Sequence, residues 1–132
     1  MKVLADTSAL LALYVSDDAN HARALEFARQ HPRVRYVLTE LILAEVATRL
    51  RALAGAERAA SVTLSLLESR RYELLFADTG LLRGAIDKMG RFRDKRLSLT
   101  DCASFEVMER LGLREAFSFD RDFRDCGYPT VP

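Results

Sequence analysis

Four acidic side chains lie in stretches of sequence that are otherwise apolar, and their chemistry needs an explanation. Asp6 directly follows a short apolar run at the start of the chain, and Asp120 follows a second run near its end. Glu45 lies within "LTELILAEVATRL" and Asp101 within "LSLTDCASFEVMERL", where both fall on predicted helices. A buried carboxylate is unfavourable unless it is paired, hydrogen-bonded or bound to a metal ion.

A divalent cation would give this set of carboxylates both stability and a chemical use. Negative charges in one pocket repel each other strongly at the low effective dielectric of a protein interior, and a bound cation relieves that repulsion. Oxygen ligands without His or Cys favour Mg²⁺ or Mn²⁺ over zinc. Such an ion can activate a water molecule and stabilise an in-line displacement at phosphorus. The set therefore predicts a metal-dependent hydrolase that acts on phosphodiesters.

Two of the acids also have a structural explanation in helix capping. Asp6 could cap a helix that follows it, because Asp is a favoured N-cap residue. Asp101 ends the sequence Ser98-Leu99-Thr100-Asp101, which resembles a capping box, and an acid in the first turn of a helix suits the helix dipole. Taken one at a time, neither residue separates capping from metal binding.

The other two acids have structural alternatives of a different kind. Glu45 shares a predicted helix face with apolar residues, and it could instead form an ion pair with Arg49 four positions later. Asp120 could be a turn residue where the chain leaves a strand. Asp122 competes with Asp120 for any functional role, and Ser118 could orient the carboxylate through a hydrogen bond.

The elements that must position these acids alternate between strands and helices. Strand-like runs are predicted at Lys2–Ala5, Arg35–Leu38, Tyr72–Phe76, Ala116–Phe119 and, more weakly, Tyr128–Val131. Helices are predicted at His21–Gln30, from a Thr39 cap to Ala54, and at Ala56–Arg70, Leu81–Met89 and Leu99–Leu111. This alternation predicts an α/β fold with a mainly parallel sheet. Ligands of such sheets bind beyond the carboxyl ends of the strands, at a switch point in strand order, where Asp6 and Asp120 would lie.

Length and composition limit the class of protein. A chain of 132 residues is most simply one domain, and its 49% hydrophobic and 30% charged residues indicate a globular chain rather than a disordered one. The net charge of +1 excludes a polycation, so nucleic-acid binding would need a local basic patch. The apolar start is too short to span a bilayer and lacks a cleavage pattern, which predicts a cytoplasmic protein without a membrane partner. Cys102 and Cys126 form no CxxC motif and are predicted to be reduced.

Four segments together resemble the PIN-domain nucleases, and in particular the VapC-type toxins of toxin–antitoxin pairs. They are "VLADTSALLALY", "ELILAEVATRL", "LSLTDCASFEVMERLG" and "AFSFDRDFRDCGY", and their order and spacing agree with that family. The resemblance covers essentially the whole chain. It implies a three-layer α/β/α PIN-like fold over residues 1–132, with a central, mainly parallel sheet of about five strands.

The same resemblance implies the roles of individual residues. The family's acidic quartet, which is catalytic and binds metal, matches Asp6, Glu45, Asp101 and Asp120. Supporting positions match Thr7, Ser8, Thr100 and Ser118, with Asp122 as a neighbour of the ligand Asp120. The resemblance further implies a ribonuclease that depends on Mg²⁺ or Mn²⁺, is commonly a homodimer, and is silenced by a cognate antitoxin.

A basic segment just before Asp101 is the first candidate for RNA binding. Arg83, Lys88, Arg91, Arg93, Lys95 and Arg96 face only two acids between positions 83 and 96. This segment could guide a polyanionic backbone toward the acids, or it could be an ordinary solvated loop. Arg121 and Arg124 flank Asp120 and could add contacts. The candidate RNA-binding residues are Arg91, Arg93, Lys95, Arg96 and Arg121.

Several readings of the chain remain open at this level. Phe92 could stack on a base or anchor the basic segment. The Leu- and Ala-rich hairpin at Thr39–Arg70 could present an apolar face to a second copy or to an antitoxin segment. The alternative functions are a catalytically idle or free-standing PIN domain, a receiver domain, and a phosphatase-like hydrolase. The first strand ends in "DTS", which lacks the paired acids of a receiver and the DxD of a phosphatase.

Overall fold

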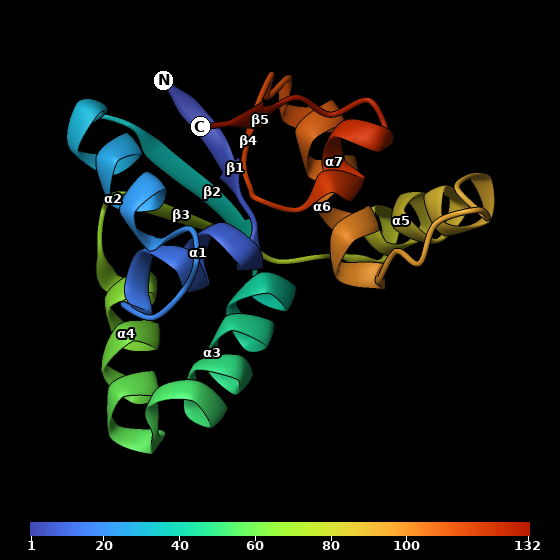
Figure 1. Cartoon of the computed structure of the whole chain (residues 1–132). Helices are drawn as coiled ribbons and strands as arrows, with labels where there is room; N and C mark the ends of the chain where they lie inside the picture. The colour runs from blue at the N-terminus through green and yellow to red at the C-terminus, as the bar shows by residue number, and fades with distance from the viewer.

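A five-stranded parallel sheet forms the centre of the protein, seen here in a computed structural model that describes residues 1–132. Its strands are β1 (Lys2–Ala5), β2 (Arg35–Thr39), β3 (Tyr72–Leu75), β4 (Ala116–Phe117) and β5 (Thr130–Val131). All neighbouring strands are parallel, in the order β3-β2-β1-β4-β5 (Figure 1). The first three strands are added in one direction, and β4 then pairs with the other side of β1. The switch point therefore lies between β1 and β4.

Seven helices cover the two faces of this sheet and complete the three-layer architecture. They are α1 (Thr7–Tyr14), α2 (His21–Gln30), α3 (Glu40–Ala54), α4 (Ala56–Glu68), α5 (Thr79–Arg91), α6 (Leu99–Leu111) and α7 (Arg121–Asp125). The first four supply buried side chains to one core, and the last three supply a second core on the opposite face (Figure 1). None of the helices combines the length and the apolar character that a bilayer crossing requires.

The central strands β1 and β2 are mainly apolar after their first residues because both of their faces are buried. Side chains alternate across a strand, so Val3 and Ala5 of β1 join the first core while Leu4 joins the second. In β2, Tyr36 belongs to the first core and Val37 to the second. A continuous apolar run is the sequence pattern expected of a parallel sheet covered on both sides.

The predicted fold class is confirmed, and several predicted boundaries agree with the structure. The helices at His21–Gln30 and Leu99–Leu111 have the predicted bounds, and the helix capped by Thr39 ends before Gly55 as expected. The helix predicted at Leu81–Met89 starts two residues earlier because the Asp78 side chain accepts a hydrogen bond from the Leu81 amide. The one-turn helix α7 was not predicted, and the strand predicted at Ala116–Phe119 ends at Phe117.

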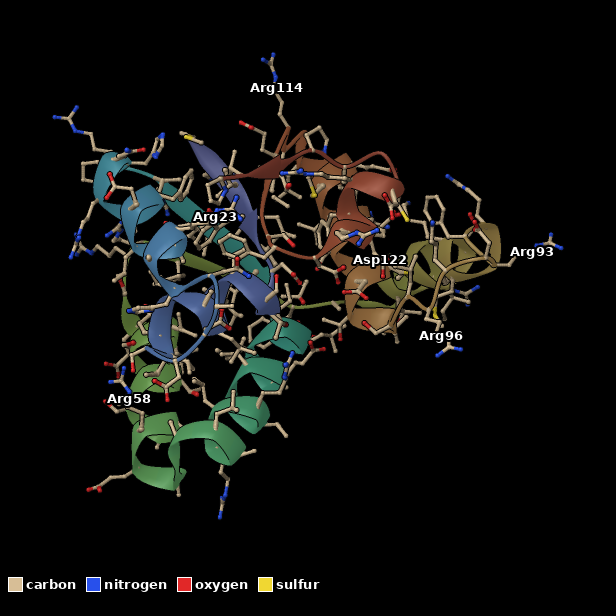
Figure 2. The ribbon with its side chains drawn as sticks, viewed as in Figure 1. Arg23, Arg58, Arg93, Arg96, Arg114 and Asp122 are labelled. Carbon is tan, nitrogen blue, oxygen red and sulfur yellow. The ribbon has the colours of Figure 1, made fainter.

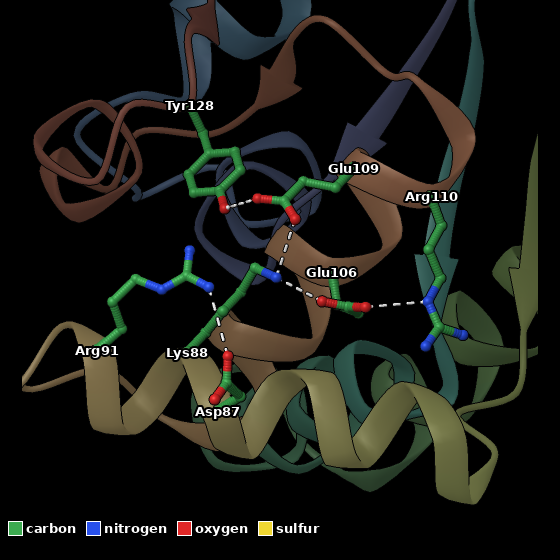
Figure 3. A network of polar contacts seen from close by, with 7 residues as sticks. All are labelled: Asp87, Lys88, Arg91, Glu106, Glu109, Arg110 and Tyr128. Carbon is green, nitrogen blue, oxygen red and sulfur yellow. Dashed lines mark hydrogen bonds and ion pairs between the residues drawn. The ribbon is translucent and has the colours of Figure 1, made fainter.

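A network of ion pairs around the buried Lys88 side chain joins α5 to α6 (Figure 3). The Lys88 side chain is only 4% exposed, and its ammonium group pairs with Glu106 and, at 3.0 Å, with Glu109. Burial lowers the pKa of Lys88, but the two carboxylates outweigh burial and raise it overall. Glu109 also accepts a hydrogen bond from the Tyr128 hydroxyl at 2.7 Å. Lys88 is therefore part of the structure and is not available to RNA.

Candidate active site

Asp6 lies at the carboxyl end of β1, where a set of hydrogen bonds holds its carboxylate in place. Its Oδ2 atom accepts hydrogen bonds from Ser8 Oγ at 2.7 Å and from Ser118 Oγ at 2.9 Å. The same atom caps α1 by accepting from the Ser8 amide at 3.4 Å. Asp6 is therefore an N-cap, as one explanation of the sequence proposed. All of these bonds end on Oδ2, which leaves Oδ1 without a protein partner.

Ser118 ties the ends of β1 and β4 together across the switch point. Its hydroxyl donates to Asp6 and accepts a hydrogen bond from the Asp120 amide at 3.0 Å. Ser8 makes a second link, because its hydroxyl accepts from the Phe119 amide at 3.0 Å. Asp6 and Asp120, which are 114 positions apart in the sequence, are thus held at the same edge of the sheet.

Asp120 is the N-cap of α7. Its Oδ1 atom accepts a hydrogen bond from the Asp122 amide at 2.9 Å, and its Oδ2 atom has no protein partner. Asp122 differs from Asp120 in the titratable groups whose pKa values its charge affects. The charge of Asp120 affects Asp6 and Asp101, whereas the charge of Asp122 adds to burial in raising the pKa of Cys126.

Asp101 lies in the first turn of α6 and forms the predicted capping box. Its Oδ2 atom accepts from the Ser98 amide at 3.1 Å, and Ser98 Oγ accepts from the Asp101 amide at the same distance. Glu45 lies on α3 and is half-buried. The alternative ion pair between Glu45 and Arg49 is not formed in the structure, since no salt bridge involves either residue.

The four acids are close enough to influence one another electrostatically. Burial raises the pKa of Asp6 from 3.8 to about 6, with a further contribution from the charges of Asp101 and Asp120, while the Ser8 and Ser118 hydrogen bonds oppose the rise. Burial also raises the pKa of Asp101, the Ser98 hydrogen bonds oppose it, and the charges of Asp120 and Glu45 add to it. Carboxylates with perturbed pKa values, gathered at the switch point of a parallel sheet, indicate a functional site.

The carboxylates do not form a closed cage in the structure. No group of three or more His, Cys, Asp or Glu side chains is arranged so that it could hold a metal ion without some movement. The physical reason is visible at each Asp: one oxygen is bound by a capping or hydroxyl group, and the carboxylates repel one another. Even so, Asp6, Asp101 and Asp120 each keep one oxygen without a protein hydrogen bond. This all-oxygen donor set fits a hard divalent cation.

The remaining predicted supporting residues lie beside the acids but differ in their contacts. Thr7 is buried, and its Oγ1 atom has no hydrogen-bond partner, so Ser8 is the hydroxyl that binds Asp6. Thr100 is half-buried next to Asp101, and its carbonyl accepts a hydrogen bond from Ser104 Oγ at 3.0 Å. Both threonines are thus present at the site without binding a carboxylate.

The predicted RNA-binding residues fall into two groups. Arg93 and Arg96 are exposed on the loop between α5 and α6, at the far end of the molecule (Figure 2). Arg91 pairs with Asp87 on α5 at 3.3 Å, and Lys95 lies 3.9 Å from an Asp125 oxygen. Phe92 is half-buried and packs edge-on against Phe105, so it anchors this loop.

Arg121 lies elsewhere, in a polar cavity next to Asp120. The cavity has a volume of about 190 Å³, and Ser118 and Asp120 form part of its wall. Arg23 of α2 and Arg124 of α7 complete the basic lining. The sequence analysis missed Arg23, because an arginine on the exposed face of a predicted helix carries no signal until the fold brings it to Phe119.

Comparisons with known proteins identify the family and the fold of this chain. Residues 3–127 match the PIN domain family. The chain is 32% identical over 132 residues to the "23S rRNA-specific endonuclease VapC20" of two Mycobacterium tuberculosis strains, which covers 98% of this chain and 97% of that protein. The crystal structure of the M. tuberculosis VapC20, a "Sarcin-Ricin loop cleaving toxin", superposes with a TM-score of 0.89 at 25% identity, over 96% of this chain and 95% of that one.

Two more distant structures share the fold. FitAcB from Neisseria gonorrhoeae has a TM-score of 0.69 at 13% identity and covers all of this chain and 97% of its own. VapBC2 from Rickettsia felis, bound to a DNA fragment from its promoter, has a TM-score of 0.68 at 11% identity and covers 100% of this chain and 98% of its own. The chain therefore belongs to the PIN-domain family, and within it to the VapC-type endoribonuclease toxins.

Proposed function

We propose that this protein cleaves RNA phosphodiesters at the carboxyl edge of the sheet with the help of Mg²⁺ or Mn²⁺. The observation that carries the proposal is the set of three aspartates from three separate elements, each with one oxygen bound by the protein and one oxygen free. Asp6, Asp101 and Asp120 would hold the ion, with Glu45 as a fourth ligand directly or through water. A bound ion of this kind supplies an activated water and offsets charge that develops on the phosphate.

The protein's own groups prepare the acids for this role. Ser8 and Ser118 fix the Asp6 carboxylate from one side, so that its free oxygen keeps one direction. The Ser98 capping box does the same for Asp101, and the start of α7 does so for Asp120. Burial and mutual repulsion of the acids favour the binding of a cation over solvation of separate charges. The supporting hydroxyls therefore act by orientation.

The substrate that we propose is 23S ribosomal RNA, which is what the similar VapC20 endonucleases are named for. The activity would then reside in the cytoplasm, within one nuclease domain at residues 1–132. Exposed Arg93 and Arg96, together with Arg91, Lys95 and Arg121, would contact phosphates along the bound RNA.

Cleavage of an RNA stem-loop with the sarcin–ricin sequence tests this proposal directly. We expect the wild-type protein to cut it at one position with Mn²⁺ or Mg²⁺, and EDTA to abolish cutting. Asp101→Asn should be inactive, because the amide keeps the acceptor for Ser98 but cannot supply an anionic ligand. Asp87→Asn, an exposed carboxylate on α5, is the matched control and should stay active. Cleavage that persists in EDTA, or in Asp101→Asn, would contradict the proposal, and an intact but idle wild type would favour a binding role.

We also propose that an antitoxin segment occupies the apolar groove between α3 and α4. The groove has a volume of about 470 Å³, and Leu64 and Leu67 beside it are 51% and 53% exposed. An apolar helix laid into such a groove is a common mode of peptide recognition. Leu64→Glu should weaken inhibition by the protein encoded next to this gene and leave RNA cleavage unchanged. If the antitoxin inhibits the wild type and Leu64→Glu equally, it does not bind in this groove.

A homodimer is the second proposed assembly. Ile86 and Met89 are 59% and 42% exposed on α5, and their spacing of three residues places them on one helix face. Sedimentation of the wild type should give the mass of a dimer, and Ile86→Glu the mass of a monomer. A monomeric wild type would refute the dimer, and a dimeric Ile86→Glu would refute this interface.

A further inference from the structure

A cavity beside Asp120 gathers three arginines that have no carboxylate partner. Arg23 comes from α2, while Arg121 and Arg124 come from α7, and all three are exposed. None of them takes part in a salt bridge. In Figure 2, Arg23 lies in the left half of the view, whereas Arg93 and Arg96 of the α5–α6 loop lie in the right half, beside α5. The cavity is therefore a basic site separate from that loop.

Two of the guanidinium groups are already held in position. The Arg23 guanidinium lies over the Phe119 ring, with its central carbon 5.2 Å from the ring centroid. The Arg124 Nε atom donates a hydrogen bond to Thr130 Oγ1 at 2.6 Å, which leaves its terminal amino groups free to turn into the cavity. Guanidinium groups fixed in this way lose little conformational entropy when they bind an anion. Their planar forks match the oxygens of a phosphate.

The cavity is continuous with the proposed catalytic edge. Ser118 and Asp120 line it, and the same Ser118 hydroxyl donates to Asp6. A strand of RNA whose scissile phosphate lies at the aspartates would therefore bring an adjoining phosphate to the arginines. The three arginines also explain the choice of ligand, because they attract a chain that carries one negative charge per nucleotide.

We infer that Arg23, Arg121 and Arg124 form a subsite for a non-scissile backbone phosphate of the RNA substrate. This inference rests on the proposed ribonuclease function and adds a position that the α5–α6 loop does not provide. The subsite would fix the strand relative to the aspartates, so Arg23 and Arg124 are positioning residues.

Binding in EDTA separates this subsite from the metal site. We would measure the affinity of a fluorescein-labelled sarcin–ricin stem-loop by fluorescence anisotropy, with wild type, Arg23→Gln and Arg124→Gln. Each variant should bind at least about 10-fold more weakly, the loss expected for one charged hydrogen-bonded contact. The salt dependence should also fall, by about 0.7 in the slope of log K against log salt. Arg29→Gln, an exposed arginine on the same helix α2 with the same charge change, is the control.

A set of RNAs with one uncharged methylphosphonate each locates the phosphate. At one position next to the cut, the substitution should weaken binding to the wild type and have no further effect on Arg23→Gln. Arg23→Lys should recover part of the affinity, because it keeps the charge but not the fork. Thermal unfolding midpoints of the variants should match the wild type.

Two results would overturn the subsite while leaving the nuclease intact. One is that Arg23→Gln and Arg124→Gln bind RNA no more weakly than Arg29→Gln. The other is that they bind RNA normally but lose affinity for the antitoxin, which would assign the cavity to a protein carboxylate. Failure of the proposed function has a different signature, since a wild type that never cuts RNA with Mn²⁺ can still show the methylphosphonate effect.

Discussion

Asp6 is both a structural residue and a candidate ligand, and its two oxygens divide these tasks. Oδ2 caps α1 and binds two serine hydroxyls, while Oδ1 has no protein partner. Capping does not cancel the cost of burial, because the pKa of Asp6 is raised to about 6 by burial and by the neighbouring acids. In the protein without metal, the charged form of Asp6 is thus less favourable than it is in the unfolded chain.

Because the buried charge of Asp6 is unfavourable for folding, we predict that Asp6→Asn stabilises the metal-free protein. The folded state keeps the Asp6 proton up to a pH of about 6, while the unfolded chain releases it near 3.8. Between these values the folded state binds more protons, so rising pH lowers the wild-type stability, and the loss is complete above pH 6. At pH 7 in EDTA, the variant should be more stable by about 3 kcal/mol.

Denaturant unfolding of the two proteins in EDTA at pH 4 and pH 7 provides the measurement. The difference in the free energy of unfolding between variant and wild type should be small at pH 4 and should reach its full value at pH 7. Taking the difference removes the effects of pH that both proteins share. Asp17→Asn, which removes an exposed carboxylate after α1, is the control for the loss of one negative charge. A variant that is less stable than the wild type at pH 7 would contradict the argument.

The choice between Asp120 and Asp122 gives a second prediction at this scale. Asp120 acts on Asp6 and Asp101, whereas Asp122 acts on Cys126. Asp120→Asn should therefore lower the rate of RNA cleavage by at least about 100-fold, and Asp122→Asn should lower it less than about fivefold. Single-turnover cleavage with Mn²⁺ measures both. Equal losses in the two variants would return Asp122 to the set of candidate ligands.

The sequence was informative about single residues where local chemistry recurs within a few positions. The capping box of Ser98 and Asp101 was readable because both partners lie in one turn. Ser118 was predicted to orient the Asp120 carboxylate, but its hydroxyl instead donates to the distant Asp6 and, at Asp120, accepts only from the amide. Arg23 was not identifiable, since its role depends on the contact of α2 with Phe119.

At the scale of elements, boundaries were predictable where capping and periodicity agree. Thr39 and Gly55 frame α3, since the Thr39 side chain accepts from the Ile42 amide and Gly55 has φ of 89°. That positive φ suits glycine and few other residues. By contrast, α7 has five residues and β4 and β5 have two each, which is too short for a periodic pattern to appear. The two strands are placed by pairing, of β4 with β1 and of β5 with β4.

The contact between α5 and α6 depends on Gly84, a glycine within a helix rather than in a turn. A Cβ atom at Gly84 would overlap the Glu106 carboxyl group, whereas one at Gly90 would meet nothing within 4 Å. Gly84→Ala should therefore push Glu106 away from Lys88 and destabilise the protein by about 1 to 3 kcal/mol. Gly90→Ala, on the same helix, should stabilise it by about 0.5 to 1 kcal/mol, because alanine is the better helix former.

Chemical denaturation of the two glycine variants checks this pair of predictions. The opposite signs exclude a general effect of adding a methyl group to α5. Because the α5–α6 loop carries Arg93 and Arg96, Gly84→Ala should also weaken RNA binding, while Gly90→Ala should leave it unchanged. A neutral or stabilising Gly84→Ala would show that Glu106 moves aside at no cost.

At the scale of the whole molecule, the candidate ligands connect regions that are far apart in the chain. Asp6 follows β1, Asp101 begins α6, and Asp120 follows β4. The helix after Asp6 packs in one core, and α6 packs in the other, so the acids lie where the two halves of the protein meet. An ion bound to all three would cross-link both cores, and it could not bind the unfolded chain in the same way.

Metal binding should therefore stabilise the entire fold. A ligand that binds only the folded state at 100 times its Kd adds about 2.7 kcal/mol. For a chain of this length, each kcal/mol raises the Tm by about 4 °C. Mn²⁺ in millimolar amounts should thus raise the Tm of the wild type by about 10 °C at pH 7, and less at pH 5, where protons compete for Asp6. Asp101→Asn should lose most of this shift, whereas Asp87→Asn should retain it. Because Tm is read without RNA, an equal shift in both variants would place the ion outside the aspartates even if cleavage requires metal.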